Sequence, residues 1–218
     1  MTILSRLVAG TIAIAACAVH ASASTIAIGS GAFGPGSTLT TFTGVPNGTE
    51  VNGMIVDGIT FSWSLGNGKL VVTGPLPATN NLSGNAISKS MGPSSGILTL
   101  TFPSLIDSFG YGFTIMNTAV LSNATTIALF NGAVPVGSLS YGAAPDPANS
   151  GGFAGIESTL PFNRVEITFD PVTVPAFQVD NIRTATAVPE PSSLLLCGSC
   201  IVLGSRYRQR RLRGRQRA

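Results

Sequence analysis

Eight carboxylate side chains are the groups in the middle of this 218-residue chain that could carry out chemistry. A glycoside hydrolase needs two such carboxylates on opposite sides of a cleft. A calcium site needs carboxylate and carbonyl oxygens together, and Asp180 beside Asn181 is the strongest candidate for one. No pair falls in a recognised motif, so solvated surface charge is the favoured interpretation of the acids, and a polar edge or turn interaction is the favoured interpretation of Asp180. The eight are Glu50, Asp57, Asp107, Asp146, Glu157, Glu166, Asp170 and Asp180.

Three aromatic side chains, Trp63, Phe109 and Tyr111, could form a platform on which a sugar ring stacks. Each alternates with small or polar residues along a β-like segment, so the same side chains also suit the buried face of a strand. We therefore expect them in the core.

The glycines of residues 29–34, Gly-Ser-Gly-Ala-Phe-Gly, match the spacing of a dinucleotide-binding loop. That use requires a helix directly after the loop, with its N-terminus at the pyrophosphate. Pro35 and Gly36 follow instead, so the segment predicts a turn.

Residues 24–188 contain neither histidine nor cysteine, because His20, Cys17, Cys197 and Cys200 all lie nearer the ends. This composition excludes Ser-His-Asp and Cys-His nucleophiles, His/Cys zinc sites and thiol redox chemistry from that part. Its four basic and eight acidic residues give a net charge of −4, which excludes a basic surface for nucleic acid. We expect no enzymatic activity and no cofactor.

The hydrophobic pattern between residues 24 and 187 has a period of two. The segment 164–170 is the clearest case, with Val165, Ile167 and Phe169 on one face and charged or polar residues on the other. Such alternation indicates antiparallel strands with one buried face, and turn-forming Asn-Gly and Asp-Gly pairs separate the segments. The predicted fold is all-β, a single antiparallel β-sandwich of jelly-roll-like form.

About ten strands are expected, with the main loop at 142–152. The predicted strands are 25–28, 60–65, 69–73, 98–102, 109–115, 125–130, 134–140, 152–157, 164–170 and 176–183.

The first 23 residues have the organisation of a secretory signal peptide. Arg6 provides the positive charge, residues 7–19 are apolar, and Ala21-Ser22-Ala23 forms an A-x-A site for signal peptidase. The cleavage residues are Ala21 and Ala23, so the mature chain would start at Ser24. An alternative is a lipobox ending at Cys17, which would make Cys17 the lipidated residue.

The C-terminal segment, residues 188–218, combines three features in order. Pro189, Glu190 and Pro191 come first, then an apolar stretch at about 192–205, then a tail at 206–218 with seven arginines. The apolar stretch predicts a short single-pass membrane helix, and the arginines favour a cytoplasmic position for the tail.

This arrangement resembles the PEP-CTERM sorting signal, also named the ice-binding protein C-terminal domain. The resemblance implies an exported protein that an exosortase recognises and cleaves near the Pro-Glu-Pro motif. The segment 177–182, Phe-Gln-Val-Asp-Asn-Ile, together with residues 152–156, 161–162 and 165–167, is similar to the C-terminal half of β-sandwich ectodomains common among PEP-CTERM proteins. That similarity implies fold more than activity.

Together these features predict a protein exported across the inner membrane of a Gram-negative-type bacterium. It would be anchored transiently and then reach the cell surface or the extracellular matrix, associated with exopolysaccharide and without catalytic activity. Signal peptidase and exosortase would be its processing partners. The first alternative is a carbohydrate-binding module, with or without structural calcium, and the second is a glycoside hydrolase.

Overall fold

The computed structural model describes residues 24–79, 82–89, 95–145 and 149–186. The elements are β1 Thr25–Ala27, η1 Ser30–Ala32, β2 Thr38–Thr40, β3 Ile55–Val56, β4 Ile59–Trp63, β5 Val71–Thr79, β6 Leu82–Lys89, β7 Ile97–Ile115, β8 Leu121–Asn131, β9 Val134–Pro145, β10 Ser150–Phe169 and β11 Phe177–Ala185. All strand pairs are antiparallel, so the predicted all-β antiparallel fold is confirmed.

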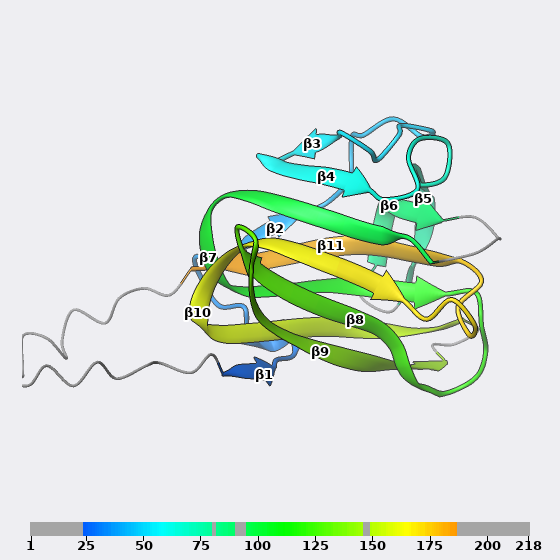
Figure 1. Cartoon of the computed structure of the whole chain (residues 1–218). Helices are drawn as coiled ribbons and strands as arrows, with labels where there is room; N and C mark the ends of the chain where they lie inside the picture. The colour runs from blue at the N-terminus through cyan, green and yellow to red at the C-terminus, as the bar shows by residue number, and fades with distance from the viewer. Residues whose placement is uncertain (1–23, 80–81, 90–94, 146–148, 187–218) are drawn as a thin grey trace, which may run out of the picture.

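Two long strands, β7 and β10, bend over and so take part in both layers of the molecule (Figure 1). In one layer, the first half of β7 pairs with β4 and with the second half of β10, which pairs with β8. In the other layer, the second half of β7 pairs with β11 and with the first half of β10. The bends lie near residues 102–108 and 157–164, where the β7–β10 register shifts. We call this side of the molecule the bend end.

The last strand, β11, lies in the middle of its layer. One edge of β11 pairs with β7, and the other pairs first with β6 and then with β2. The register between β6 and β11 is set by Phe177 opposite Lys89, and between β11 and β7 by Phe177 opposite Ile115. We call the side of the molecule that carries Lys89, Ile115 and Phe177 the pocket end.

The space between the layers is filled by apolar side chains from nearly every strand. Alternation places them there, as in β4, where Ile59, Phe61 and Trp63 are buried and the two residues between are exposed. Burying one such large side chain contributes about 1.5–3 kcal/mol, and with no cysteine in residues 24–188 the core must hold the fold. The largest enclosed side chains are Tyr111, Phe42, Phe61, Phe109, Phe113, Phe162 and Phe177.

Both ends of the described chain leave the sandwich at the bend end (Figure 1). Ala185 of β11 lies opposite Ser108 of β7, Ser108 lies opposite Glu157 of β10, and Glu157 lies opposite Ile26 of β1. Three strand spacings therefore separate β1 from β11, about 14 Å. The backbone of Ser24 continues the β1 ladder by bonding Thr159.

The strand predictions need three corrections. Residues 98–102 and 109–115 belong to one bent strand, and so do 152–157 and 164–170, because each strand crosses between layers without ending. The short strands β2 and β3 and the strand β6 were not predicted. The predicted loop 142–152 is wrong at both sides, since β9 runs to Pro145 and β10 starts at Ser150, where they pair with each other.

The predicted signal peptide, residues 1–23, and the predicted sorting segment, residues 188–218, lie outside the described residues. The described residues contain no helix with the length and apolar character that crossing a membrane requires.

Candidate functional site

The pocket end holds a depression of about 260 Å³ where β6, β7 and β11 meet. Two neighbouring rows of residues cross these strands there. One row contains Lys89, Phe177 and Ile115, and the next contains Ser88, Gln178 and Thr114. The lining is Ser88, Lys89, Thr114, Ile115, Met116, Asn149, Ala176, Phe177 and Gln178.

An aromatic cluster supports the floor of this pocket. The ring of Phe177 stacks on Phe169 with centroids 3.9 Å apart and forms a T-shaped pair with Trp63, with centroids 6.1 Å apart. Phe177 and Trp63 are 2% and 3% exposed, so their rings pack in the core. This packing holds the pocket wall in place.

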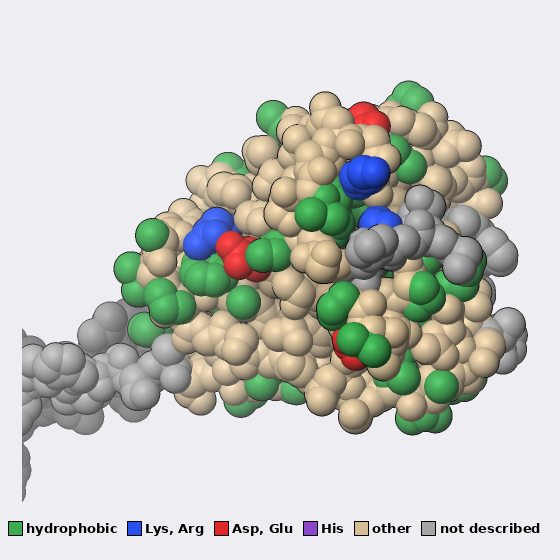
Figure 2. Space-filling view, turned by 45° about the vertical axis from the view of Figure 1, so that its right-hand side comes forward, with side chains coloured by type: hydrophobic (Ala, Val, Ile, Leu, Met, Phe, Trp, Pro, Cys, Tyr) green, Lys and Arg blue, Asp and Glu red, His purple; other side chains and the backbone are tan. Residues whose placement is uncertain are grey.

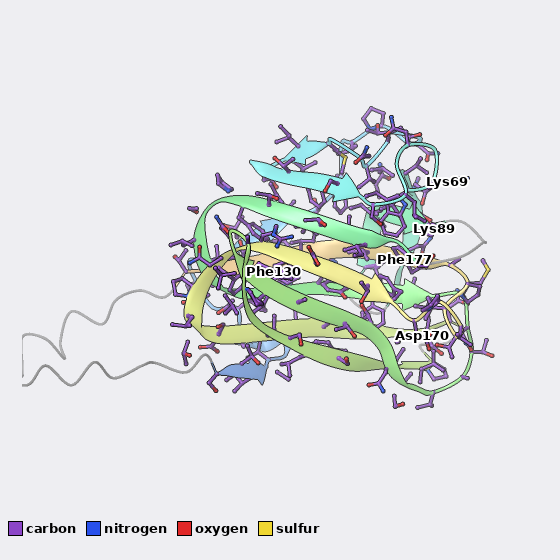
Figure 3. The ribbon with its side chains drawn as sticks, viewed as in Figure 1. Lys69, Lys89, Phe130, Asp170 and Phe177 are labelled. Carbon is purple, nitrogen blue, oxygen red and sulfur yellow. The ribbon has the colours of Figure 1, made fainter. Side chains whose placement is uncertain are left out.

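Among the described residues, Lys89 is the charged residue that lines the pocket. Lys89, which ends β6, is almost fully buried, and burial, with the neighbouring Lys69 cation, lowers the pKa of its ammonium group. Figure 3 shows Lys69, Lys89 and Phe177 together at this end of the molecule. No carboxylate of the described residues lines the pocket. Its chemistry is therefore that of a hydrogen-bonding site with one ammonium group and neutral amides and hydroxyls.

A second pocket, of about 430 Å³, lies at the bend end, and two carboxylates line it. Asp107 is half-buried and accepts a hydrogen bond from the Ser108 hydroxyl at 2.8 Å, whereas Glu157 is exposed. A general acid of a glycoside hydrolase is normally enclosed by apolar groups, which does not fit an exposed Glu157. The pair lies beside Ser158 and Thr159, close to Ser24 and Thr186, the first and last described residues.

Asp180, the predicted calcium candidate, is fully buried and fills the junction where β6 gives way to β2 along β11. Its Oδ2 accepts a hydrogen bond from the backbone N–H of Ser83 at 3.1 Å. Burial raises the pKa of this carboxyl group, and nearby backbone N–H groups of Asn181, Ser83 and Phe42 oppose the rise. N–H donors do not coordinate cations, so these surroundings oppose calcium there.

No group of three or more acidic, histidine or cysteine side chains suited to a metal exists among residues 24–79, 82–89, 95–145 and 149–186. The Asp180 carboxylate instead compensates backbone groups at a break in strand pairing. The left-handed φ of 52° at Asn181 and the register shift that follows Asp180 mark the same break.

The prediction that the aromatic residues are core residues is confirmed. Phe109 and Tyr111 are fully enclosed and Trp63 nearly so, which removes them as a sugar-stacking platform. The Tyr111 hydroxyl shares a hydrogen bond of 2.6 Å with the Thr125 hydroxyl, and burial raises the pKa of Tyr111.

The predicted surface roles of Glu166 and Asp170 are also confirmed. Arg164 forms an ion pair with Glu166, lies 4.0 Å from the centroid of the Phe130 ring, and donates to the Gly132 carbonyl at 3.0 Å. This fastens the β8–β9 turn to β10. Asp170 accepts hydrogen bonds from Val172 N and the Thr173 hydroxyl, which closes a tight turn.

The remaining sequence candidates divide in two. The glycine-rich segment 29–34 forms a single 3₁₀ turn, η1, as expected for a turn. The sorting residues Pro189, Glu190 and Pro191 and the cleavage residues Ala21 and Ala23 lie outside the described residues and stay predictions.

Sequence reasoning missed the pocket at the pocket end. Its residues come from three segments far apart in the sequence, and β6 itself was not predicted, so no local spacing points to the site. One signal was available: Lys69 and Lys89 are the only lysines between residues 24 and 188.

Neither a known protein family nor a curated protein matches this sequence. Among solved structures, the chain is similar to a mutant of a family 29 carbohydrate-binding module, with 13% identity, 69% of this chain and 92% of that chain covered, and a TM-score of 0.40. A second structure, "Carbohydrate binding module family29", has 14% identity, coverages of 69% and 90%, and a TM-score of 0.37. The catalytic domain of a GH87 alpha-1,3-glucanase has 11% identity, 66% and 30% coverage, and a TM-score of 0.37. Scores below 0.5 establish neither a ligand nor an activity for this chain.

Proposed function

We propose that the chain is an exported, non-catalytic protein of the cell surface or extracellular matrix, with a jelly-roll-like sandwich between two processed ends. The observation that carries this proposal is that both ends of the sandwich leave at the bend end (Figure 1). A membrane helix at about 192–205 would then hold the domain by that end. The pocket end would point outward, about 26 Å further along β11, which spans nine residues.

The surface of the sandwich suits a matrix component. Figure 2 shows a face on which neutral polar groups and backbone dominate, with few charged and scattered hydrophobic side chains. The candidate acids have structural roles, as the ion pair of Glu166, the turn of Asp170 and the buried Asp180 illustrate. These roles support a protein without catalytic function.

Processing is tested by expressing the full chain in a bacterium that contains an exosortase. We expect the wild-type protein to be released, and mass spectrometry to show that both of its ends are shortened. Glu190→Ala should keep its C-terminal segment and stay in the membrane fraction. Glu157→Ala, which removes an exposed carboxylate of the sandwich, is the matched control and should be processed like wild type. Equal masses for wild type and Glu190→Ala would contradict the proposal.

A second function, carbohydrate binding by the sandwich, is favoured by one observation. The pocket at the pocket end gathers two amides, two hydroxyls and an ammonium group against a rigid aromatic wall. Placed polar groups on an apolar wall are typical of small-ligand sites. Retention of the full chain on exopolysaccharide of the producing cell tests this function. We expect retention to persist in EDTA, because N–H groups surround Asp180. Passage through the column unretained would contradict it.

A further inference from the structure

The residue that follows the predicted signal-peptidase cut is already part of the sheet. Ser24 donates its backbone N–H to the Thr159 hydroxyl at 3.0 Å, and its carbonyl accepts the N–H of Thr159 at 3.0 Å. Cleavage after Ala23 would convert this neutral amide nitrogen into an α-ammonium group, with a positive charge and three donors. The new charge would therefore arise in the β1 ladder, directly beside β10.

The register of the sheet brings Glu157 next to this nitrogen. Ile26 lies opposite Glu157, and the two backbone bonds place Ser24 opposite Thr159. Glu157 and Thr159 share one face of β10, because residues two apart on a strand point the same way, and both are exposed while Ser158 between them is buried. Glu157 is thus the diagonal neighbour of Ser24, a position that a long side chain can bridge.

The charged groups that face β1 are negative. β1 packs against β10, which carries Glu157, and against β9. In β9 the titratable side chain is Tyr141, whose hydroxyl donates to the Gly155 carbonyl at 2.6 Å and whose pKa is raised by burial, so it stays neutral. Asp107 of β7 lines the same pocket as Glu157. An ammonium group at Ser24 would therefore be attracted.

The basic residues of the sandwich do not oppose this attraction. Arg183 lies on β11, three strand spacings or about 14 Å from β1, which exceeds the Debye length of about 8 Å at physiological salt. Arg164 forms an ion pair with Glu166 in the other layer. Lys69 and Lys89 lie at the pocket end (Figure 3).

We propose that removal of the signal peptide creates an ammonium group at Ser24 that Thr159 and Glu157 bind, so that cleavage fastens β1 to β10. This rests on the proposed function, because it requires export and a cut after Ala23. β1 has three residues and a single described partner strand, so it is a segment that opens locally with ease. In the uncut chain the Ser24 nitrogen has one N–H, which Thr159 already accepts. Since the ammonium forms only after the cut, Glu157→Ala is still expected to be processed like wild type.

The test uses the full chain, purified in detergent and divided in two. One half is treated with signal peptidase, and mass spectrometry identifies its first residue, while the other half stays uncut. Trace acetylation of the Ser24 α-amine against pH, read by peptide mass spectrometry, gives the pKa of that group. Hydrogen exchange of the Thr159 N–H, which donates to the Ser24 carbonyl, reports how firmly β1 is closed.

In the cut protein we expect the pKa of the Ser24 α-amine to lie about 0.5 above the value of about 7.7–8.0 for an unpaired N-terminus, as suits an exposed ion pair. Glu157→Gln should return it to that value. The matched control, Glu166→Gln, removes the same charge in the other layer and should keep the raised pKa.

Below pH 7 the Thr159 N–H should exchange about threefold more slowly in cut wild type than in cut Glu157→Gln, because half a pKa unit is a factor of about three in an equilibrium. This difference should disappear as pH rises through the folded pKa of the amine, since the ammonium is then lost. In the uncut proteins the two should exchange alike.

An α-amine pKa that Glu157→Gln does not change, or an equal effect of Glu157→Gln on Thr159 exchange in cut and uncut protein, would overturn the ammonium site and leave the proposed export intact. A first residue other than Ser24, such as the alternative Cys17, would overturn the cut after Ala23 and this site with it. Release of the full chain from the bacterium tests export separately.

Discussion

The two ends of the sandwich differ in the charged residues that line their pockets and in construction. At the pocket end, strands begin or end, and one lysine with neutral donors lines the pocket. At the bend end, β7 and β10 cross between layers without a break, and Asp107 and Glu157 line the pocket. The chain also enters and leaves the sandwich at the bend end (Figure 1).

Under the proposed function, this difference would separate attachment at the bend end from recognition at the pocket end. Continuous strands at the bend end keep the layers joined where the predicted anchor would pull on them. Strands end at the pocket end, and binding residues are commonly placed at the loops that follow strand ends.

The largest effect is expected from Phe177→Ala at the pocket end. Phe177 is buried, stacks on Phe169 and contacts Trp63, so its loss leaves a cavity and should reduce the free energy of unfolding by about 3–5 kcal/mol. Urea unfolding followed by circular dichroism measures this. Val172→Ala, at an exposed turn position, should unfold like wild type. A loss below about 1 kcal/mol would show that the pocket wall is not part of the core.

Asp180 of β11 lies between the two ends and accepts a hydrogen bond from the backbone of Ser83 in β6. Asp180→Ala should reduce the free energy of unfolding by about 1–3 kcal/mol, because the N–H of Ser83 loses its buried acceptor. Asp180→Asn keeps an acceptor oxygen and should fall between wild type and Asp180→Ala in urea unfolding. Identical midpoints for all three proteins would contradict the bridging role.

The pH dependence gives a sharper test of the same residue. The folded pKa of Asp180 is raised above 3.8, so its contribution to stability is full below pH 3.8 and is lost as pH rises through the folded pKa. The pKa of Asp170 is lowered, so its contribution is lost as pH falls. The difference in unfolding free energy between wild type and Asp180→Asn should therefore decrease with rising pH, and that for Asp170→Asn should increase. Parallel slopes in urea titrations would refute this assignment.

Gly96, which directly precedes β7, has no room for a side chain. A Cβ there would overlap the ring of Trp63, so Gly96→Ala should destabilise the fold by about 1–3 kcal/mol through overpacking. The thermal midpoint and the Trp63 fluorescence spectrum measure this. Gly31→Ala, where space is open, is the control. An unchanged midpoint with an unchanged spectrum would contradict the contact.

The smallest effect is expected at the bend end, where Arg164 and Glu166 are partly exposed, with side chains 27% and 24% accessible. Glu166→Gln should cost about 0.2–1 kcal/mol, and less at high salt, because solvent screens the pair. Arg164→Ala should cost more, since its contact with Phe130 and its bond to Gly132 are also lost. Urea titrations at two salt concentrations measure both variants. If Glu166→Gln and Arg164→Ala reduce the free energy of unfolding equally, the stabilisation comes from the ion pair alone.

Much of the fold could be predicted from local pattern, because alternation is a direct consequence of one-sided burial. The segment 164–170 shows this, with its inward Val165 and outward Glu166 in place. The bends could not be predicted, because a strand that crosses between layers has the same local signals as two strands joined by a turn. The strand β6 was missed because its Gly84-Asn85 pair is typical of a turn, and only pairing with β5 and β11 holds it extended.

The candidate site was less accessible to sequence reasoning than the fold. Its residues at 88–89, 114–116 and 176–178 meet only through register between strands, and register depends on the whole sheet. Asp180 was singled out correctly as unusual, yet its partners turn out to be backbone N–H groups. A sequence does not show which backbone N–H groups will face a given side chain.

The central position of β11 has a consequence for how the chain is made. Because synthesis proceeds from the N-terminus, the strand that separates β6 from β7 is the last to appear, and Ala185 precedes Pro189 of the predicted sorting motif by only four positions. A chain that stops early would lack both the middle of its sheet and the predicted sorting motif. Under the proposed function, this order of elements would couple completion of the sheet to sorting, because a truncated product would have neither.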